Sequence, residues 1–180
     1  MPKLLWANAY CLLDTSSGAS MAVRTMLQCL QQNGWEIEIV GATVFDTPTG
    51  LTRLGAVWDQ IEVTSKKIVN VQDDALRHQL VKTRATERRQ MTAEEEGVWF
   101  SLYQKSLDEF QPDIVYYYGG QPLDMLVPVE AKKRGISSVA YLANGNYSGK
   151  RWCEDVDLVL TDSEATASYY CERDGIAVTP

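Results

Sequence analysis

Histidine is almost missing from this sequence, since His78 is the only one among 180 residues. A zinc site built on several histidines and a Ser/His/Asp triad therefore have little basis. Three other patterns are absent: the nucleophile elbow G-x-S-x-G, the phosphate loop G-x-x-x-x-G-K and the dinucleotide fingerprint G-x-G-x-x-G. These absences argue against a serine hydrolase and against ATP or NAD enzymes. We expect no metal and no permanently bound cofactor.

Basic residues are outnumbered, with 17 Lys and Arg against 24 Asp and Glu, a formal net charge of −7 and a pI near 4.8. A nucleic-acid binder needs a basic surface, so nucleic acid is excluded as a partner. No apolar run is long enough to span a bilayer, and only Lys3 precedes the first run, which is unlike a signal peptide. We therefore predict a cytoplasmic protein.

The four cysteines, Cys11, Cys29, Cys153 and Cys171, are widely separated and form no C-x-x-C pair. Neither a zinc knot nor a disulfide framework is indicated by this spacing. We predict four buried, reduced thiols.

The sequence does contain a repeated junction between a helix and a strand. Glycine ends three helical patterns, at Gly34, Gly135 and Gly175, and an apolar β-rich run follows each one at once. Glycine just past a helix supplies the left-handed conformation that closes it. Short connections of this kind are typical of βαβ units.

Five apolar runs are nearly continuous rather than strictly alternating, which is typical of strands buried on both faces. They are LLWANA, EIEIVGA, DIVYYYG, SVAYLA and LVLTD. Helical stripes over 23–30 and 98–110 mark core-facing sides between them. Residues of the kinds that begin helices precede three patterns: Thr92 with Glu95, Pro122, and Ser163. The sequence predicts one Rossmann-like α/β domain over residues 1–180, an open, mostly parallel sheet with helices on both faces.

Residues 43–90 are polar and irregular and fit this alternation less well. They hold two candidate strands, KKIVNVQ and HQLVKTRAT, and a short helix in GLTRLGAVWDQI, so we expect extra strands or a flap inserted here. A basic run ends the stretch and carries Arg77, Lys82, Arg84, Arg88 and Arg89. Contact with an anionic lipid-linked acceptor or the inner membrane surface is one interpretation, and a solvated face is the simpler one.

Ligands of open α/β sheets bind beyond the carboxyl ends of the strands. After the first strand, Ser17, Gly18 and Ala19 form a hydroxyl-rich loop that leads into a helix, where free amides and the dipole favour a phosphate. The alternative is that Ser17 and Ser20 cap this helix and Gly18 makes an ordinary turn.

Three later loops are candidates for binding a sugar or an acceptor, because small polar side chains suit sugar hydroxyls and glycines let the backbone come close. Their residues are Tyr118, Gly119 and Gly120; Asn144, Gly145 and Asn146; and Ser163. Tyr118 is the one tyrosine of its strand that lies next to a loop. No pair of carboxylates stands out as acid and base, so the catalytic residues remain unassigned.

Taken in order, these segments resemble the N-terminal domain of a GT-B glycosyltransferase, most similar to glycosyltransferase family 4. The resemblance rests on SSGASMAVRTMLQCLQQNGWEIEIV, QPDIVYYYGG, KKRGISSVAYL and VDLVLTDSEATASYY, and excludes residues 43–90. Two positions depart from the family pattern: Asn144 stands where histidine is common, and Ser17 where the loop usually has a second glycine.

The resemblance implies a metal-independent, retaining transferase that uses a nucleotide sugar as co-substrate and a glycan or lipid-linked acceptor. This half would shape the acceptor site, and a missing C-terminal domain would hold most of the donor. The loop at Ser17, Gly18 and Ala19 would face the donor diphosphate. Two alternatives stay open: a flavodoxin-like FMN-binding electron carrier, because DTSSGAS also resembles a flavin-phosphate loop, and a non-catalytic sugar- or nucleotide-binding module.

Overall fold

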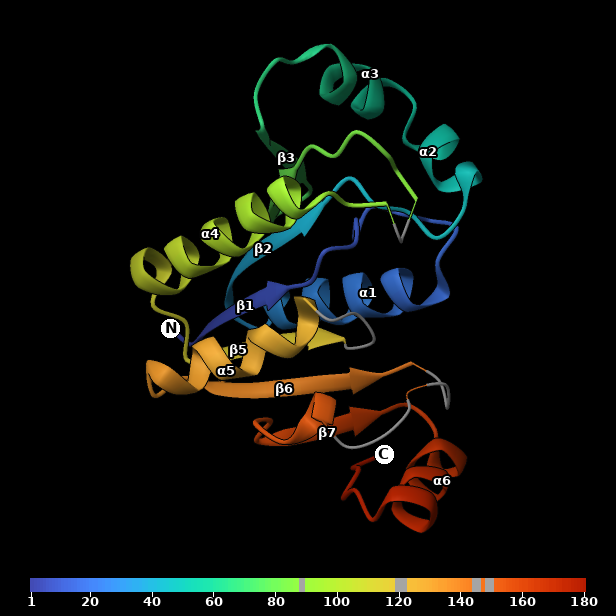
Figure 1. Ribbon diagram of the computed structural model, residues 1–180, viewed down its shortest axis with the longest axis vertical. Helices are drawn as coiled ribbons and strands as arrows, with labels where there is room; N and C mark the ends of the chain where they lie inside the picture. The colour runs from blue at the N-terminus through green and yellow to red at the C-terminus, as the bar shows by residue number, and fades with distance from the viewer. Residues whose placement is uncertain (88–89, 119–122, 144–146, 148–150) are drawn as a thin grey trace.

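A seven-stranded sheet forms the centre of the computed structural model, which describes residues 1–87, 90–118, 123–143, 147 and 151–180 (Figure 1). The strands are β1 (Lys3–Ala7), β2 (Glu36–Ala42), β3 (Ile68–Asp73), β4 (Leu76–Val81), β5 (Ile114–Tyr118), β6 (Ser137–Leu142) and β7 (Leu158–Thr161). Their order across the sheet is β3-β4-β2-β1-β5-β6-β7, and all neighbours run parallel except β3 and β4. The predicted open, mostly parallel sheet is confirmed.

Helices connect the strands as the sequence predicts. They are α1 (Gly18–Gln32), α2 (Pro48–Leu54), α3 (Ala56–Val63), α4 (Ala93–Phe110), α5 (Leu126–Lys133) and α6 (Glu164–Asp174), with short 3-10 turns η1 (Leu123–Met125) and η2 (Arg151–Cys153). The three predicted helix-ending glycines, Gly34, Gly135 and Gly175, have φ values of 87°, 70° and 62°. The capping box at the start of α4 and the serine cap of α6 are both present. Pro122 lies outside the described residues.

Helices cover both faces of the sheet. Two successive residues of β4, which point to opposite faces, show which helix lies on each face. His78 and Gln79 point to opposite faces because side chains alternate along a strand. On the His78 side, Asp73 accepts two hydrogen bonds of 2.5 Å from Arg24 of α1. On the Gln79 side, Glu38 accepts hydrogen bonds from Gln79 and from a serine hydroxyl of α4. α1 and α4 therefore lie on opposite faces (Figure 1).

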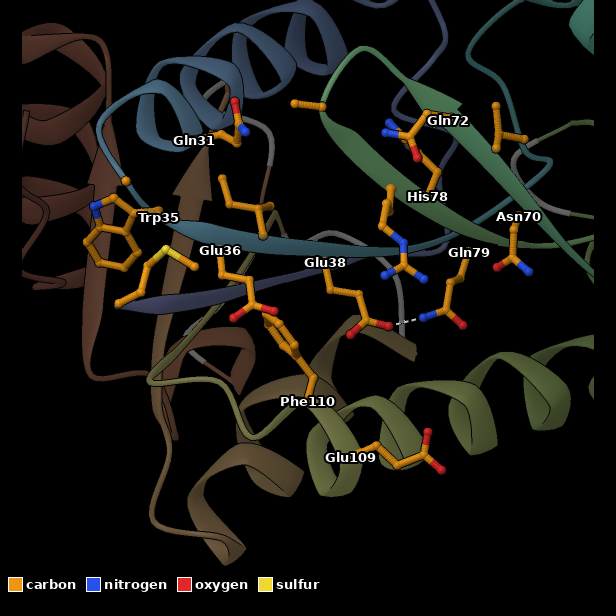
Figure 2. A pocket seen from close by; sticks show the side chains of 16 residues that line it. Gln31, Trp35, Glu36, Glu38, Asn70, Gln72, His78, Gln79, Glu109 and Phe110 are labelled. Atoms are coloured by element: carbon orange, nitrogen blue, oxygen red, sulfur yellow. Dashed lines mark hydrogen bonds between the residues drawn. The ribbon is translucent and has the colours of Figure 1, made fainter.

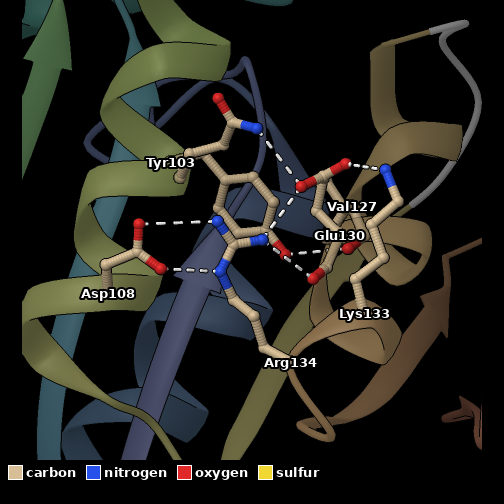
Figure 3. Close-up of polar contacts among 7 residues, drawn as sticks. Tyr103, Asp108, Val127, Glu130, Lys133 and Arg134 are labelled. Atoms are coloured by element: carbon tan, nitrogen blue, oxygen red, sulfur yellow. Dashed lines mark hydrogen bonds and ion pairs between the residues drawn. The ribbon is translucent and has the colours of Figure 1, made fainter.

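The contact between α4 and α5 shows how one of these helical layers is held together (Figure 3). The buried hydroxyl of Tyr103 donates a 2.8 Å hydrogen bond to the carbonyl of Val127. Arg134 bridges the two helices, with its guanidinium 2.7 Å from Asp108 and 2.9 Å from Glu130. Lys133 also pairs with Glu130, and these cations lower the pKa of its carboxyl to about 2.

The stretch 43–90 holds the two strands that the sequence predicts there, β3 and β4. The predicted short helix is two helices, α2 and α3, separated by Gly55 at a φ of 51°. A second, smaller apolar cluster lies under them and packs against the sheet: Cys11, Leu13, Phe45, Ile61, Val69 and Leu80. This cluster therefore joins the insertion to the loop after β1, which contributes Cys11 and Leu13.

The structure corrects two expectations about single residues. Arg77 and Arg84 of the basic run are exposed, as a solvated face requires, but His78 between them is fully buried because β4 lies between β2 and β3. Only Cys11 of the four free cysteines is buried, and burial raises the pKa of its thiol to about 12. Cys29 and Cys171 are exposed because they lie on the outward sides of α1 and α6.

No helix within the described residues combines the length and the apolar character that crossing a membrane requires.

Candidate functional site

Six parallel strands bring their carboxyl ends to one edge of the sheet, which we call the carboxyl edge. The loops after β1, β5, β6 and β7 begin there, and the predicted site residues lie in these loops or directly at their ends. The opposite edge, where the same strands begin, we call the amino edge. The prediction that these loops share one edge is confirmed as far as the described residues extend.

Asn8, the residue directly after β1, fixes the start of the first loop. Its side chain is fully buried, and its amide nitrogen donates to the carbonyl of Tyr118 at 2.5 Å and to Asp124 Oδ1 at 3.0 Å. Its amide oxygen accepts from the backbone N–H of Tyr10 at 3.1 Å. One side chain therefore ties the end of β1 to the end of β5 and to η1.

Asp14 fixes the middle of the same loop with both of its carboxylate oxygens. Oδ1 accepts from the backbone N–H and the hydroxyl of Ser16, at 2.8 and 2.6 Å, and Oδ2 accepts from the backbone N–H of Asp46 at 2.8 Å. Gly50 of α2 lies against this carboxylate so closely that an added Cβ would be 2.1 Å from Oδ1. The first loop is therefore joined to the insertion that carries α2.

The predicted phosphate loop stands at the start of α1. Ser17 is buried and caps the helix, its hydroxyl accepting from the backbone N–H of Ser20 at 3.4 Å. Gly18 is exposed and Ala19 is half-buried, and the remaining amides of the first turn have no partner within the helix. Gly18 has no positive φ, and an added Cβ would meet no atom within 4 Å. The chain's own conformation therefore does not require glycine at this position.

Tyr118, a predicted sugar-binding residue, is buried at the end of β5. Its hydroxyl is 3.3 Å from the hydroxyl of Ser20, and its ring lies 5.5 Å from Trp6 and 5.9 Å from Tyr10. Burial raises the pKa of this phenol well above its usual range. The described contacts of Tyr118 hold α1 onto the sheet, and its role toward a ligand stays a prediction.

The remaining predicted residues have different outcomes. Ser163 begins α6, and its hydroxyl accepts from the backbone N–H of Thr166 at 3.2 Å, so its predicted cap is confirmed. Five predicted residues lie outside the described residues: Gly119, Gly120, Asn144, Gly145 and Asn146. Their roles as binding residues stay predictions.

Tyr141 and Asp162 form a further candidate site at the carboxyl edge. The buried Tyr141 donates its hydroxyl to Asp162 Oδ2 at 3.0 Å, and Asp162 itself is exposed. Burial and the adjacent carboxylate raise the pKa of Tyr141 to about 12, so this phenol keeps its proton and holds the carboxylate in place. A carboxylate oriented in this way can accept a hydrogen bond from a hydroxyl group. In the sequence, only the position of Asp162 directly after a predicted strand indicates this role.

The amino edge also carries a hollow, of about 770 Å³ (Figure 2). Its polar walls include Glu38 and Gln79, which are hydrogen-bonded to each other, and burial raises the pKa of Glu38. None of the predicted binding residues lines it. Within the described residues, no group of three or more His, Cys, Asp or Glu side chains is arranged to hold a metal ion.

Comparisons with known proteins give structural similarity only: neither a protein-family model nor a curated protein matches this sequence. The UDP-GlcNAc 2-epimerase from Neisseria meningitidis bound to UDP-GlcNAc matches 99% of this chain over 45% of its own, with a TM-score of 0.56 and 11% identity. MurG from Acinetobacter baumannii matches 99% of this chain over 46% of its own, with a TM-score of 0.52 and 15% identity.

A third solved structure, trehalose-6-phosphate synthase from E. coli bound with UDP-2-fluoro glucose, matches 96% of this chain over 42% of its own, with a TM-score of 0.51 and 10% identity. The chain spans less than half the length of each of these proteins. At such identities the similarity concerns the fold, which glycosyltransferases and epimerases share, and it leaves family 4 a prediction. This chain has the fold of one Rossmann-like half of a GT-B protein.

Proposed function

We propose that this chain is the N-terminal, acceptor-side half of a two-domain glycosyltransferase that transfers a sugar from a nucleotide-sugar donor to a glycan or lipid-linked acceptor. The observation that carries the proposal is the start of α1. There Gly18 leaves the first amides of the helix open, although no contact within the described residues requires glycine. A diphosphate that approaches the backbone would require it.

The chemistry would rest on positioning and on charge. The first turn of α1 presents amide donors and the positive end of the helix dipole to the leaving diphosphate, which stabilises the charge that develops on it. Asn8 and Asp14 keep the preceding loop in one conformation through their bonds to backbone groups. Asp162, oriented by Tyr141, accepts a hydrogen bond from an acceptor hydroxyl. A second domain would supply most contacts to the nucleotide.

The half-domain interpretation is supported by the coverage of the similar proteins, each matched over less than half of its length. We therefore expect no sugar transfer by these 180 residues alone. Robust transfer by the isolated chain would refute the proposal. Contact of the basic run with the membrane also stays a prediction, and charge reversal at Arg84 should then weaken binding to anionic vesicles at low salt.

The decisive experiment is an NMR titration of the chain with UDP-N-acetylglucosamine. We expect shift changes at the amides of Gly18 and Ala19 and none at the amino edge. Gly18→Val should abolish these changes while the chain stays folded, because the new side chain would enter open space. Gly97→Ala is the matched control, since Gly97 is also exposed on a helix with nothing within 4 Å of an added Cβ. Changes confined to other regions, or unaffected by Gly18→Val, would contradict the proposal.

A second candidate is epimerisation of a nucleotide sugar, favoured by the similarity to a UDP-GlcNAc 2-epimerase. Inverting a carbon centre that bears hydrogen requires this hydrogen to leave and return, so deuterium from D₂O should enter the sugar. Incubation of the longer protein with UDP-N-acetylglucosamine in D₂O separates the two activities. The flavin alternative is tested by colour, because a bound flavin would make the purified protein yellow. The similarities to proteins bound with UDP sugars favour the transferase over the flavin carrier.

A further inference from the structure

The two outermost strands of the sheet differ in how their free sides are covered. At β7, Thr179 adds to the sheet: its N–H donates to Val159 at 2.9 Å, and its carbonyl accepts from Thr161 at 3.0 Å. At the other side β3 pairs with β4, and no other described residue pairs with its outer side. β3 therefore presents an open strand edge (Figure 1).

Little within β3 protects this edge, since Asp73 at its end is the only charged residue of the strand. The strand pairs with β4 over six consecutive residues without a bulge, and it contains neither proline nor lysine. These are the usual devices that keep an edge from pairing with another chain. Because Lys82 N–H donates to the carbonyl of Lys67, alternation along the ladder directs the N–H and C=O groups of Ile68, Asn70 and Gln72 away from β4.

Space for an incoming strand exists on both sides of β3. A hollow of about 690 Å³ lies between this strand and α4, and another of about 460 Å³ lies beside α3. Ile68 and Asn70 line both of them. The side chains of a strand added at this edge would therefore find room above and below the sheet.

We propose that the β3 edge pairs with the β3 edge of a second copy of this chain, antiparallel and about a two-fold axis at Asn70. A two-fold axis perpendicular to the sheet leaves each face of the sheet on the same side in both copies. Even-numbered residues of β3 must therefore lie opposite even-numbered residues, and odd opposite odd. With Asn70 opposite itself, Ile68 faces Gln72, and their outward N–H and C=O groups form the new ladder.

Charge complementarity selects both the partner and the register. In this register Lys66 and Lys67 of one copy lie alongside Asp74 and Asp73 of the other, at both ends of the pair. Moving the axis to Val71 would place Lys67 opposite an alanine and lose both matches. Lys66 and Asp74 are exposed, whereas Asp73 is bound to Arg24 and Lys67 to Glu94, so the new ion pairs fall mainly to Lys66 and Asp74.

Sedimentation velocity of the chain over a range of concentrations tests the proposal. A concentration-dependent monomer–dimer equilibrium is expected, and a sedimentation coefficient that stays monomeric at every concentration would overturn it. Asn70→Pro should give monomers, because its outward N–H makes no bond to β4 and proline is tolerated on an edge. Circular dichroism of this variant checks that the fold is kept.

Charge exchange keeps the test decisive even if the proline variant does not fold. Lys66→Asp and Asp74→Lys should each weaken dimerisation about fivefold at low salt, because each places like charges opposite one another. The double variant should restore the affinity of the unmodified chain. Failure of the double variant to restore it, with both single variants folded, would overturn the proposed register. The outcome is independent of any ligand at the carboxyl edge.

Discussion

The two edges of the sheet use their polar side chains differently. At the carboxyl edge, Asn8 and Asp14 are almost fully buried, and most of their hydrogen bonds go to backbone groups. At the amino edge, the half-buried Glu38 and Gln79 bind each other. Buried polar groups are costly unless satisfied, so they persist where they hold irregular backbone in one conformation. At the carboxyl edge, the loop after β1 is therefore held in one conformation by buried polar side chains.

The substitution Asn8→Ala is expected to have the largest effect and tests this difference between the two edges. The change would leave the carbonyl of Tyr118 and the N–H of Tyr10 without a buried partner, so we expect a loss of about 3 kcal/mol in the free energy of unfolding. Urea denaturation measures it. At the amino edge, Gln79→Ala should cost less than about 1 kcal/mol, and equal losses for the two variants would contradict the comparison.

A second test uses the contact between α2 and the first loop. Gly50→Ala would place a Cβ against Asp14 Oδ1, which its own hydrogen bonds hold in place, and we expect a loss of about 2 kcal/mol. In an Asp14→Ala background the same change should cost much less. Additive losses in this double-mutant cycle would show that the clash is not with the carboxylate.

The ion pairs that Glu130 makes with Lys133 and Arg134 at the end of α5 give a third, smaller effect that depends on pH. The pKa of Glu130 is lowered to about 2 in the folded protein, so its stabilisation is complete above its unfolded pKa and is lost as the pH falls toward 2. Glu130→Gln should cost about 1 kcal/mol at pH 7 and almost nothing near pH 2, because the exposed partner Lys133 lets solvent weaken the pair although Glu130 itself is buried. Thermal unfolding at both pH values measures this, and a loss independent of pH would indicate a packing effect.

The smallest expected effect, that of replacing Glu38, is a gain rather than a loss in the free energy of unfolding. Burial raises the pKa of Glu38, so the folded state prefers the protonated form, and this carboxylate opposes folding above its folded pKa. Glu38→Gln should therefore stabilise the protein by about 0.5 kcal/mol at pH 7, with a smaller gain near pH 4. A destabilised variant would mean that the charge itself is needed, for instance by Arg77, which lies beside Glu38 on the neighbouring strand β4.

The sequence predicts the regular part of this molecule well, because periodicity and helix-ending glycines such as Gly34 are local signals. It also predicts that the loops share an edge, which follows from parallel strands. The roles of Asn8 and Asp14 could not be predicted, because their hydrogen-bond partners are distant in sequence: Asn8 binds Tyr118, and Asp14 binds Asp46. The burial of His78 could not be predicted for a different reason. Its neighbours in sequence are polar, and only the strand order shows that β4 is an interior strand.

The insertion is fastened at both of its ends. Near its start, Arg53 of α2 donates to the carbonyl of Thr15 at 2.8 Å, and Thr47 donates to the hydroxyl of Ser16 at 2.9 Å. Beyond its last helix, Lys82 donates to the carbonyls of Glu62 and Thr64 at the end of α3. Helix α2 and the first loop are therefore held against each other. A ligand that binds at the first turn of α1 would therefore meet a loop that is already held in place from the side of α2.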